Sequence, residues 1–278
     1  MRNQLEIRKF MVVDGKNRKI PCCSWMPVSP NSQVVLIHGF SEHYRSYCSF
    51  AEKCGKKGIA VHSMDLPGHG LADGVRSHID DFQDYIANVD LLFEVNPNFQ
   101  KVSTYLFGHS LGGLIASHYC LQRNPKINGL IFTSPLFGFP LTTRPMLYLA
   151  NILAGKNPDT LFPVPFNVGR LSRNKKSQLF YRSDPYRGHC ISPRLLLLMH
   201  DYCRRLHDNA TDIRLPVLLF MTNGDKIVSI DAIRRFVARC GAEDKTLVAF
   251  ADAMHELIQE KENMQILDKI HSWITEHN

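Results

Sequence analysis

The 278-residue sequence lacks several features that would place it in a common protein class. No segment reaches the roughly 18 uninterrupted apolar residues that a membrane-spanning helix requires. The N-terminal residues MRNQLEIRKFMVV alternate polar and apolar side chains, so they do not contain the apolar core of a signal peptide. Internal repeats and low-complexity tracts are also absent. We therefore expect a soluble, cytoplasmic protein.

The cysteines do not follow a metal-binding or redox pattern. Eight are present, but none forms a CxxC pair or stands at metal-ligand spacing. Several lie in apolar runs, where a free cysteine behaves as a small hydrophobic residue. We expect reduced thiols and no metal site.

The sequence also lacks a block of one charge. The net charge of +7 comes from scattered Lys and Arg residues, and the pI is near 9.0. Such a charge can attract a nucleic acid or an anionic membrane surface. Because no zinc finger, RNP-like aromatic motif or basic helix accompanies it, we expect a solvated basic surface and no nucleic-acid partner.

Short apolar runs alternate with longer helical patterns along the chain, which is typical of βα units around a mostly parallel sheet. The runs predict strands over 32–39, 59–65, 102–109, 127–134, 216–224 and 245–252. Helical periodicity is present over 47–58, 80–96 and 256–277. Residues 136–205 contain many prolines and no β alternation. We interpret them as a mostly helical insertion between two parts of one core, 1–135 and 206–278, because structureless loops longer than about 15 residues are uncommon.

One motif carries chemistry by its context. Gly108-His109-Ser110-Leu111-Gly112 fits G-x-S-x-G and lies between a predicted strand and a helical pattern. This is the context of a nucleophile elbow, a turn so tight that its glycine positions leave no room for a Cβ. The following helix would point its N-terminus at the serine and favour negative charge there. Ser110 is therefore the predicted nucleophile.

A serine hydroxyl needs a base to take its proton, and the base needs an acid to orient it. In enzymes with such an elbow, the acid and then the histidine follow the serine along the chain. His255 lies in the loop after the last predicted strand, where an imidazole projects over the strand ends. Asp225 directly follows the preceding strand and its Asn-Gly turn signal. We predict a triad of Ser110, Asp225 and His255.

The remaining candidates fit the triad less well. Asp252 is close in sequence to His255, so we expect it to shape the loop. We expect Asp231 and Asp244 at helix ends or on the surface. The other histidines after Ser110 lie on predicted helices or in the insertion, where surface or core positions are expected: His118, His189, His200, His207, His271 and His277.

Acyl transfer by a serine also needs two backbone N–H groups that meet the developing oxyanion. Leu111 follows the nucleophile and supplies one of them. Phe40, after the strand VVLIHG, is the candidate for the other, and Gly39 beside it permits a close approach. Taken alone, this segment also fits an ordinary strand-ending turn. The chemistry requires no metal ion or organic cofactor.

Six segments carry a family resemblance, in order along nearly the whole chain: HGFSEHYRSY (38–47), MDLPGHGLADGVRSHIDDFQDYIANVD (64–90), FGHSLGG (107–113), LSRNKKSQLFYRSDP (171–185), NGDKIVS (223–229) and AMHELIQE (253–260). Together they resemble the monoacylglycerol lipase and lysophospholipase branch of the serine α/β-hydrolases. The resemblance implies an α/β-hydrolase fold, with a mostly parallel central sheet flanked by helices. It also implies that the insertion is a helical cap.

The resemblance places Ser110, Asp225 and His255 in the triad, and it places Phe40 and Leu111 in the oxyanion hole. Tyr181 matches a tyrosine near the family's leaving-group end. With His38, at the end of the strand before Phe40, it completes the predicted substrate-binding residues. The sequence departs from the family's HGxGEH at two positions, where it has bulky Phe40 and Ser41 in place of a glycine. The segment GHGLADG also departs from the family, because the usual small residue and serine after GHG are replaced.

The resemblance implies hydrolysis of a small lipid ester, first of all monoacylglycerol to glycerol and a fatty acid. The alternatives are a lysophospholipase, a general carboxylesterase, an aminopeptidase with the same triad and a non-catalytic binding protein. An aminopeptidase needs an acidic site for the substrate amine, which the sequence does not reveal. The oligomeric state is left open.

The insertion is also expected to contact lipid. Its apolar stretches 146–152 and 195–199 would line an acyl channel or fill the insertion's own core. Its mouth would contact a membrane surface peripherally. Four basic residues would meet anionic headgroups there: Arg170, Arg173, Lys175 and Lys176.

Overall fold

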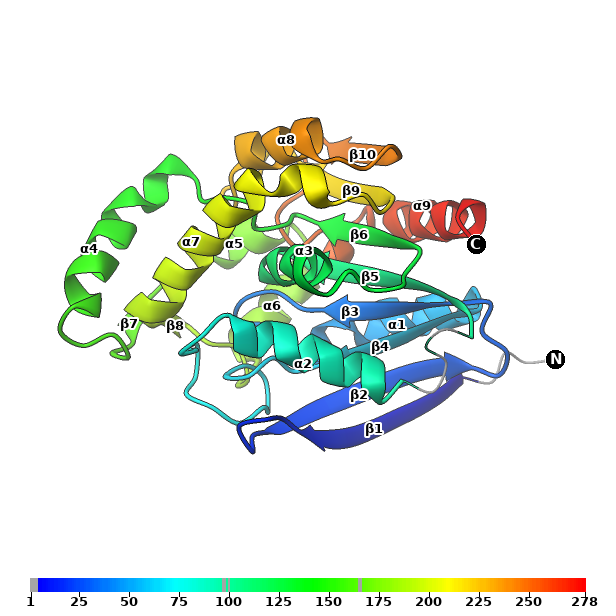
Figure 1. Ribbon diagram of the computed structural model, residues 1–278, viewed down its shortest axis with the longest axis horizontal. Coiled ribbons are helices and arrows are strands. Elements are labelled where there is room, and N and C mark those ends of the chain that lie inside the picture. Colours follow the sequence, from blue (N-terminus) through cyan, green and yellow to red (C-terminus); the bar gives the residue numbers. More distant parts are fainter. Residues whose placement is uncertain (1–4, 97–98, 100, 165–166) are drawn as a thin grey trace.

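The computed structural model describes residues 5–96, 99, 101–164 and 167–278. Eight strands form one sheet in the order β1-β2-β4-β3-β5-β6-β9-β10 (Figure 1). β2 pairs antiparallel with both of its neighbours, and the other pairs are parallel. The strands are β1 (Leu5–Val13), β2 (Lys19–Pro27), β3 (Ser32–Ile37), β4 (Ile59–Met64), β5 (Ser103–His109), β6 (Gly129–Thr133), β9 (Val217–Thr222) and β10 (Lys245–Phe250). The predicted, mostly parallel sheet is confirmed.

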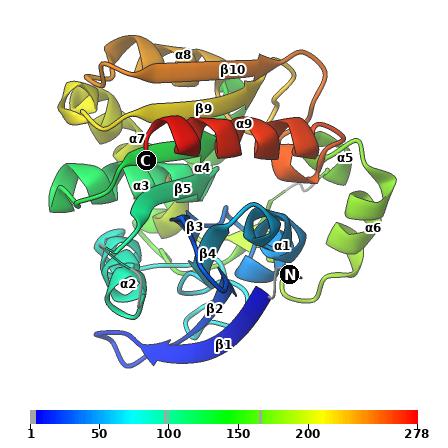
Figure 2. The same cartoon turned by 90° about the vertical axis from the view of Figure 1, so that its right-hand side faces the viewer.

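Helices cover both faces of this sheet (Figure 2). α1 (Cys48–Lys56) and α9 (Asn263–Glu276) pack on one face and bury one apolar core. α2 (Gln83–Glu94), α3 (Leu111–Arg123) and α8 (Ile230–Arg239) belong to the core of the other face. Strands covered on both faces are apolar along their whole length, which explains the uninterrupted runs VVLI and YLF in the central strands.

The chain between β6 and β9 leaves the sheet, and its longest helices stand to one side in Figure 1. It contains the short helix η2 (Leu141–Thr143), α4 (Arg144–Ala154), α5 (Val168–Leu171), α6 (Lys175–Ser183), α7 (Pro193–Asp208) and η3 (Ala210–Asp212). The insertion predicted over 136–205 is thus mostly helical, although α7 continues beyond residue 205. It also contains a small antiparallel pair, β7 (Phe162–Pro163) with β8 (Cys190–Ile191). Two-residue strands are too short to show an alternation, so the sequence did not predict them.

Two strands and the start of one helix differ from the sequence prediction. β1, with the sequence LEIRKFMVV, was not among the predicted strands. β2 was not predicted, because its sequence KIPCCSWMP is buried on both faces and has no alternation. α9 begins at Asn263 instead of residue 256, because the preceding residues form a turn and the short helix η4 (Leu257–Gln259). Another short helix, η1 (Tyr44–Tyr47), precedes α1. None of the helices in the described ranges combines the length and the apolar character needed to cross a bilayer.

Candidate active site

Ser110 lies at the turn between β5 and α3, at the carboxyl end of a central strand. Its backbone has φ 49° and ψ −116°, a conformation that non-glycine residues rarely adopt and that is common at functional sites. The flanking glycines are required by space. A Cβ on Gly108 would lie 2.5 Å from the carbonyl oxygen of Gly112, and a Cβ on Gly112 would lie 2.1 Å from that of Ile37. The turn therefore has the geometry of a nucleophile elbow.

His255 and Asp225 come from the loops that follow β10 and β9, two neighbouring strands. The imidazole Nδ1 lies 2.8 Å from Asp225 Oδ2. The other carboxylate oxygen, Oδ1, accepts the backbone N–H groups of Ile227 at 2.8 Å and Val228 at 3.1 Å. Burial opposes ionisation of Asp225, but His255 and these two N–H donors hold its pKa below the usual range. The carboxylate can therefore orient the imidazole.

Ser110 and His255 line the same cavity, which has a volume of about 280 Å³. Among the described residues, no hydrogen bond joins the hydroxyl of Ser110 to the imidazole. Such bonds often form only when substrate binds. The insertion holds the loop that carries His255 through two backbone hydrogen bonds. The His255 N–H donates to the Arg170 carbonyl oxygen at 3.4 Å, and the Glu256 N–H donates to the Leu171 carbonyl oxygen at 2.8 Å.

Phe40 and Leu111 flank the nucleophile from two sides. Leu111 is the first residue of α3, and Phe40 lines the cavity from the loop after β3. Gly39 lets the two segments approach, because a Cβ on it would lie 3.2 Å from the Cβ of Ser110. Within the part of the chain that the structure describes, the N–H of Phe40 has no acceptor. It is therefore available to a ligand atom.

The two predicted substrate-binding residues do not line this cavity. His38 is fully buried, its Nδ1 lies 2.8 Å from the Gly39 carbonyl oxygen, and its Nε2 accepts the Leu66 N–H at 2.9 Å. Its burial lowers its pKa to about 3. Tyr181 is also buried, with the guanidinium carbon of Arg187 4.2 Å from its ring centroid. Both side chains are therefore buried outside the cavity lining, and their contact with substrate stays a prediction.

The sequence analysis missed a group of buried polar side chains at the polar end of the cavity. We call Glu42, His109, Arg187 and Glu256 the acid cluster. Arg187 Nη2 lies 2.9 Å from Glu256 Oε1 and 3.6 Å from Glu42 Oε1. His109 Nε2 lies 3.9 Å from Glu42 and 3.7 Å from Glu256. Three of the four line the cavity beside Ser110.

The two carboxyl groups of the acid cluster have opposite pKa shifts. Burial opposes ionisation of Glu42, but His109, Arg187 and a 2.7 Å hydrogen bond from the Tyr47 hydroxyl lower its pKa below the usual range. Burial and the neighbouring Glu42 raise the pKa of Glu256 well above its usual range. Burial also lowers the pKa of His109 to about 4, so its ring is neutral. The guanidinium of Arg187 lies close to both carboxyl groups.

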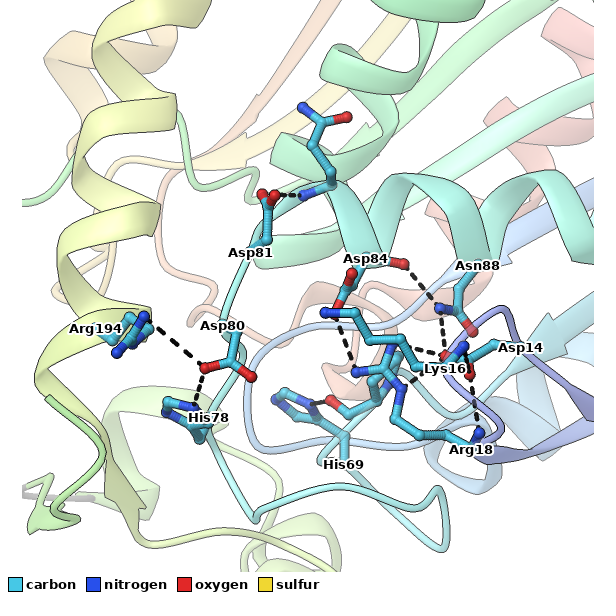
Figure 3. Close-up of polar contacts among 12 residues, drawn as sticks. Asp14, Lys16, Arg18, His69, His78, Asp80, Asp81, Asp84, Asn88 and Arg194 are labelled. Carbon is cyan, nitrogen blue, oxygen red and sulfur yellow. Dashed lines mark hydrogen bonds and ion pairs between the residues drawn. The ribbon is translucent and has the colours of Figure 1, made fainter.

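Two groups of side chains have metal-ligand atoms close together, and each also contacts an arginine. In the acid cluster, the guanidinium of Arg187 pairs with the carboxyl group of Glu256. In the second group, formed by His78, Asp80 and Asp159, Arg194 lies 3.4 Å from Asp159. It also lies 3.9 Å from Asp80 (Figure 3). Because a cation already pairs with these carboxylates, we do not assign a metal to either group.

The other end of the cavity is apolar and belongs to the insertion. Met146 on α4 and Leu196 and Met199 on α7 line it, and each comes from a stretch that the sequence marked as a possible channel wall. Other residues of these stretches do not line the cavity: Leu195 is buried in the core, and Tyr148 is exposed to solvent.

One of the four basic residues expected at a lipid surface is engaged within the protein. Arg173 pairs with Glu260 and Glu262 at 2.6 Å each. Its charge is therefore balanced within the protein. Arg170 lines the cavity.

The sheet order, the elbow and the cavity at the carboxyl ends of the strands define a serine hydrolase of the α/β-hydrolase class. The chain matches the family described as serine aminopeptidase, S33, over residues 28–262, and it belongs to this family. It is 25% identical over 256 residues to a monoacylglycerol lipase from Mycolicibacterium smegmatis, and the match covers 91% of each of the two chains. It is 27% identical over 249 residues to a phospholipase from Bacillus subtilis, covering 87% of this chain and 95% of the relative.

A solved structure extends the similarity to the whole chain. The monoacylglycerol lipase of Paleococcus ferrophilus has a TM-score of 0.82 and 29% identity, and the match covers 99% of this chain and 100% of that chain. The chain is thus a carboxylic-ester hydrolase that acts on lipid esters.

Proposed function

We propose that Ser110, His255 and Asp225 form a catalytic triad that hydrolyses monoacylglycerol to glycerol and a fatty acid. His255 takes the proton of the Ser110 hydroxyl, and the oxygen attacks the acyl carbonyl. The N–H groups of Phe40 and Leu111 stabilise the oxyanion, and the alcohol leaves with the proton from His255. Water, deprotonated by the same imidazole, then releases the fatty acid from the acyl-enzyme. The 2.8 Å contact between His255 and Asp225, at the cavity that Ser110 also lines, supports this assignment.

The acid cluster favours a neutral leaving group. Its cation, Arg187, already pairs with Glu42 and Glu256, so the acid cluster does not offer a free cation to the phosphate of a lysophospholipid. It also does not provide a free carboxylate for the ammonium group of a peptide, because Arg187 already pairs with the two glutamates. Carboxyl and imidazole groups can instead exchange hydrogen bonds with the hydroxyls of glycerol.

We expect kcat/KM for a monoacylglycerol to exceed that for lysophosphatidylcholine of the same acyl chain by at least about tenfold, because the acid cluster can hydrogen-bond the glycerol hydroxyls whereas its cation is already paired. Steady-state kinetics with both substrates below and above their micelle concentrations checks this. Equal or faster hydrolysis of the lysophospholipid would instead assign the phospholipase alternative.

We further propose that residues 136–205 act as a cap on the core and that its α4 face rests on the membrane surface. Tyr148 is 71% exposed, Leu149 45% and Ile152 48%, while Met146 of the same helix lines the cavity. Lipid at this face would therefore stand next to the apolar end of the cavity.

Replacing Tyr148 and Leu149 together by serine should weaken sedimentation with anionic vesicles by at least about tenfold, because two large apolar side chains lose their burial in lipid. Hydrolysis of a water-soluble butyrate ester should stay unchanged in the double variant. Unchanged sedimentation, or an equal loss of butyrate hydrolysis, would contradict membrane contact through α4.

A further inference from the structure

A short segment of the insertion contacts three consecutive residues beside the nucleophile. We call residues 184–188, between α6 and β8, the clasp segment, and residues 39–43 the oxyanion loop. The hydroxyl of Ser41 donates to the carbonyl oxygen of Gly188. His43 Nε2 lies 2.7 Å from Asp184 Oδ2. Between them Glu42 faces Arg187 in the acid cluster.

These contacts are shielded from water. Ser41, Glu42 and His43 are each 1% exposed, and the side chains of Asp184 and Arg187 are 3% and 1% exposed. Polar groups buried in this way hold their partners firmly, because leaving one of them unpaired is costly. The clasp segment therefore fixes the loop at three points in succession.

The loop is also fixed from its own side. The N–H of Gly39 donates to Glu42 Oε2 at 2.9 Å, and the Tyr47 hydroxyl donates to the same oxygen at 2.7 Å. Phe40 is thus held between Gly39 and Ser41, both of which make buried hydrogen bonds. Its own N–H has no acceptor in the described part of the chain, and Phe40 lines the cavity.

The backbone at Ser41 indicates why the hydroxyl matters. Its φ is 63°, in the left-handed region where glycine is favoured and a side chain adds strain. A glycine would adopt this conformation more readily, so local conformation does not explain a serine here. The bond from its hydroxyl to Gly188 is the interaction that a glycine would lack.

We propose that the clasp segment positions the oxyanion hole, with Ser41 and Asp184 as positioning residues that act through the backbone of Phe40. The inference rests on the proposed function, because it requires Phe40 to meet an oxyanion. Since negative charge on the carbonyl oxygen develops only in the transition state, loosening this loop lowers kcat and leaves substrate binding nearly unchanged.

Ser41→Gly tests this inference with little risk to folding, because glycine accepts the φ of 63°. Loss of a whole oxyanion donor costs about 10²–10³-fold in kcat, so a loosened donor should cost about tenfold, with KM unchanged. The inhibition constant of an acyl trifluoromethyl ketone, which forms a tetrahedral oxyanion on the nucleophile, should rise by the same factor. The affinity for the fatty acid product should not change. Asp184→Asn should shift the same two quantities in the same direction.

Arg194→Gln is the matched control. Arg194 also joins the insertion to the core, through its contact with Asp80, but this contact involves neither the oxyanion loop nor the cavity (Figure 3). It should leave kcat and the ketone inhibition constant unchanged. A kcat for Ser41→Gly that equals wild type, or a loss of kcat without a change in the inhibition constant, would overturn the positioning role. Failure of the proposed function would be seen separately, as a wild-type enzyme that the ketone does not inhibit.

Discussion

Replacing Ser110 by alanine should lower kcat/KM for a monoacylglycerol by about 10⁴-fold or more, because the variant cannot form an acyl-enzyme. The loss should be chemical and not structural. Alanine keeps a Cβ at the same backbone position and does not touch the glycines that make the elbow. Turnover of the substrate and thermal unfolding of the same samples measure the two effects separately.

Ser117 provides a matched control for this variant. It lies on α3, the same helix that follows the nucleophile, but its hydroxyl donates to the Gly113 carbonyl oxygen at 2.8 Å and is buried in the core. Ser117→Ala should retain kcat/KM close to that of the wild type. If Ser110→Ala kept a substantial part of the activity, another residue would be the nucleophile.

Replacing Asp225 by asparagine should lower kcat by about 10⁴-fold through the tautomer of His255. Oδ1 accepts two backbone N–H groups, so in the variant this position must be filled by the amide oxygen. The amide nitrogen then faces Nδ1 of His255 and donates to it. The ring proton moves to Nε2, which can no longer accept the proton of Ser110. Steady-state kinetics measures the loss.

Asp252 supplies the control for Asp225. It is exposed and lies three residues before His255, so Asp252→Asn should keep kcat near the wild-type value. A large loss in this variant, together with an active Asp225→Asn enzyme, would move the orienting acid to Asp252.

The lowered pKa of Asp225 also gives a sign for the pH dependence of stability. A carboxyl group whose pKa is lower in the folded state stabilises the fold above its unfolded pKa, which is about 3.9. This contribution is lost as the pH falls below that value and through the lower folded pKa. In Asp225→Asn the contribution is absent, so the free energy of unfolding should fall less steeply in this acid range.

The features that the sequence predicted share a local origin. The buried parallel strands are visible as apolar runs, and the elbow is visible as glycines between a strand and a helix. The positions of Asp225 and His255 follow from the rule that loops after parallel strands meet at one edge of the sheet. Their 2.8 Å contact requires only that two neighbouring strands, β9 and β10, end together.

The acid cluster was beyond such reasoning because its members come from distant parts of the chain. Glu42 follows β3, Arg187 follows α6, and Glu256 follows β10. Glu42, His109 and Glu256 all stood in motifs quoted above, but no motif indicated that they meet. His38 and Tyr181 were placed by strand position and by resemblance, and neither shows whether a side chain points into a cavity or behind its wall. The partners of Arg173 could not be predicted for the same reason, because Arg173 lies in the insertion whereas Glu260 and Glu262 lie in the second part of the core.

All of these expectations depend on one arrangement: the hydroxyl at position 110 is the group made reactive by the imidazole at position 255. The most direct measurement is the rate and site of labelling by a fluorophosphonate probe, read by peptide mass spectrometry in the wild type and in His255→Ala. We expect one modified residue, Ser110, and a labelling rate that falls to background in the variant. A label on a different side chain, or an unchanged rate without the imidazole, would contradict the arrangement.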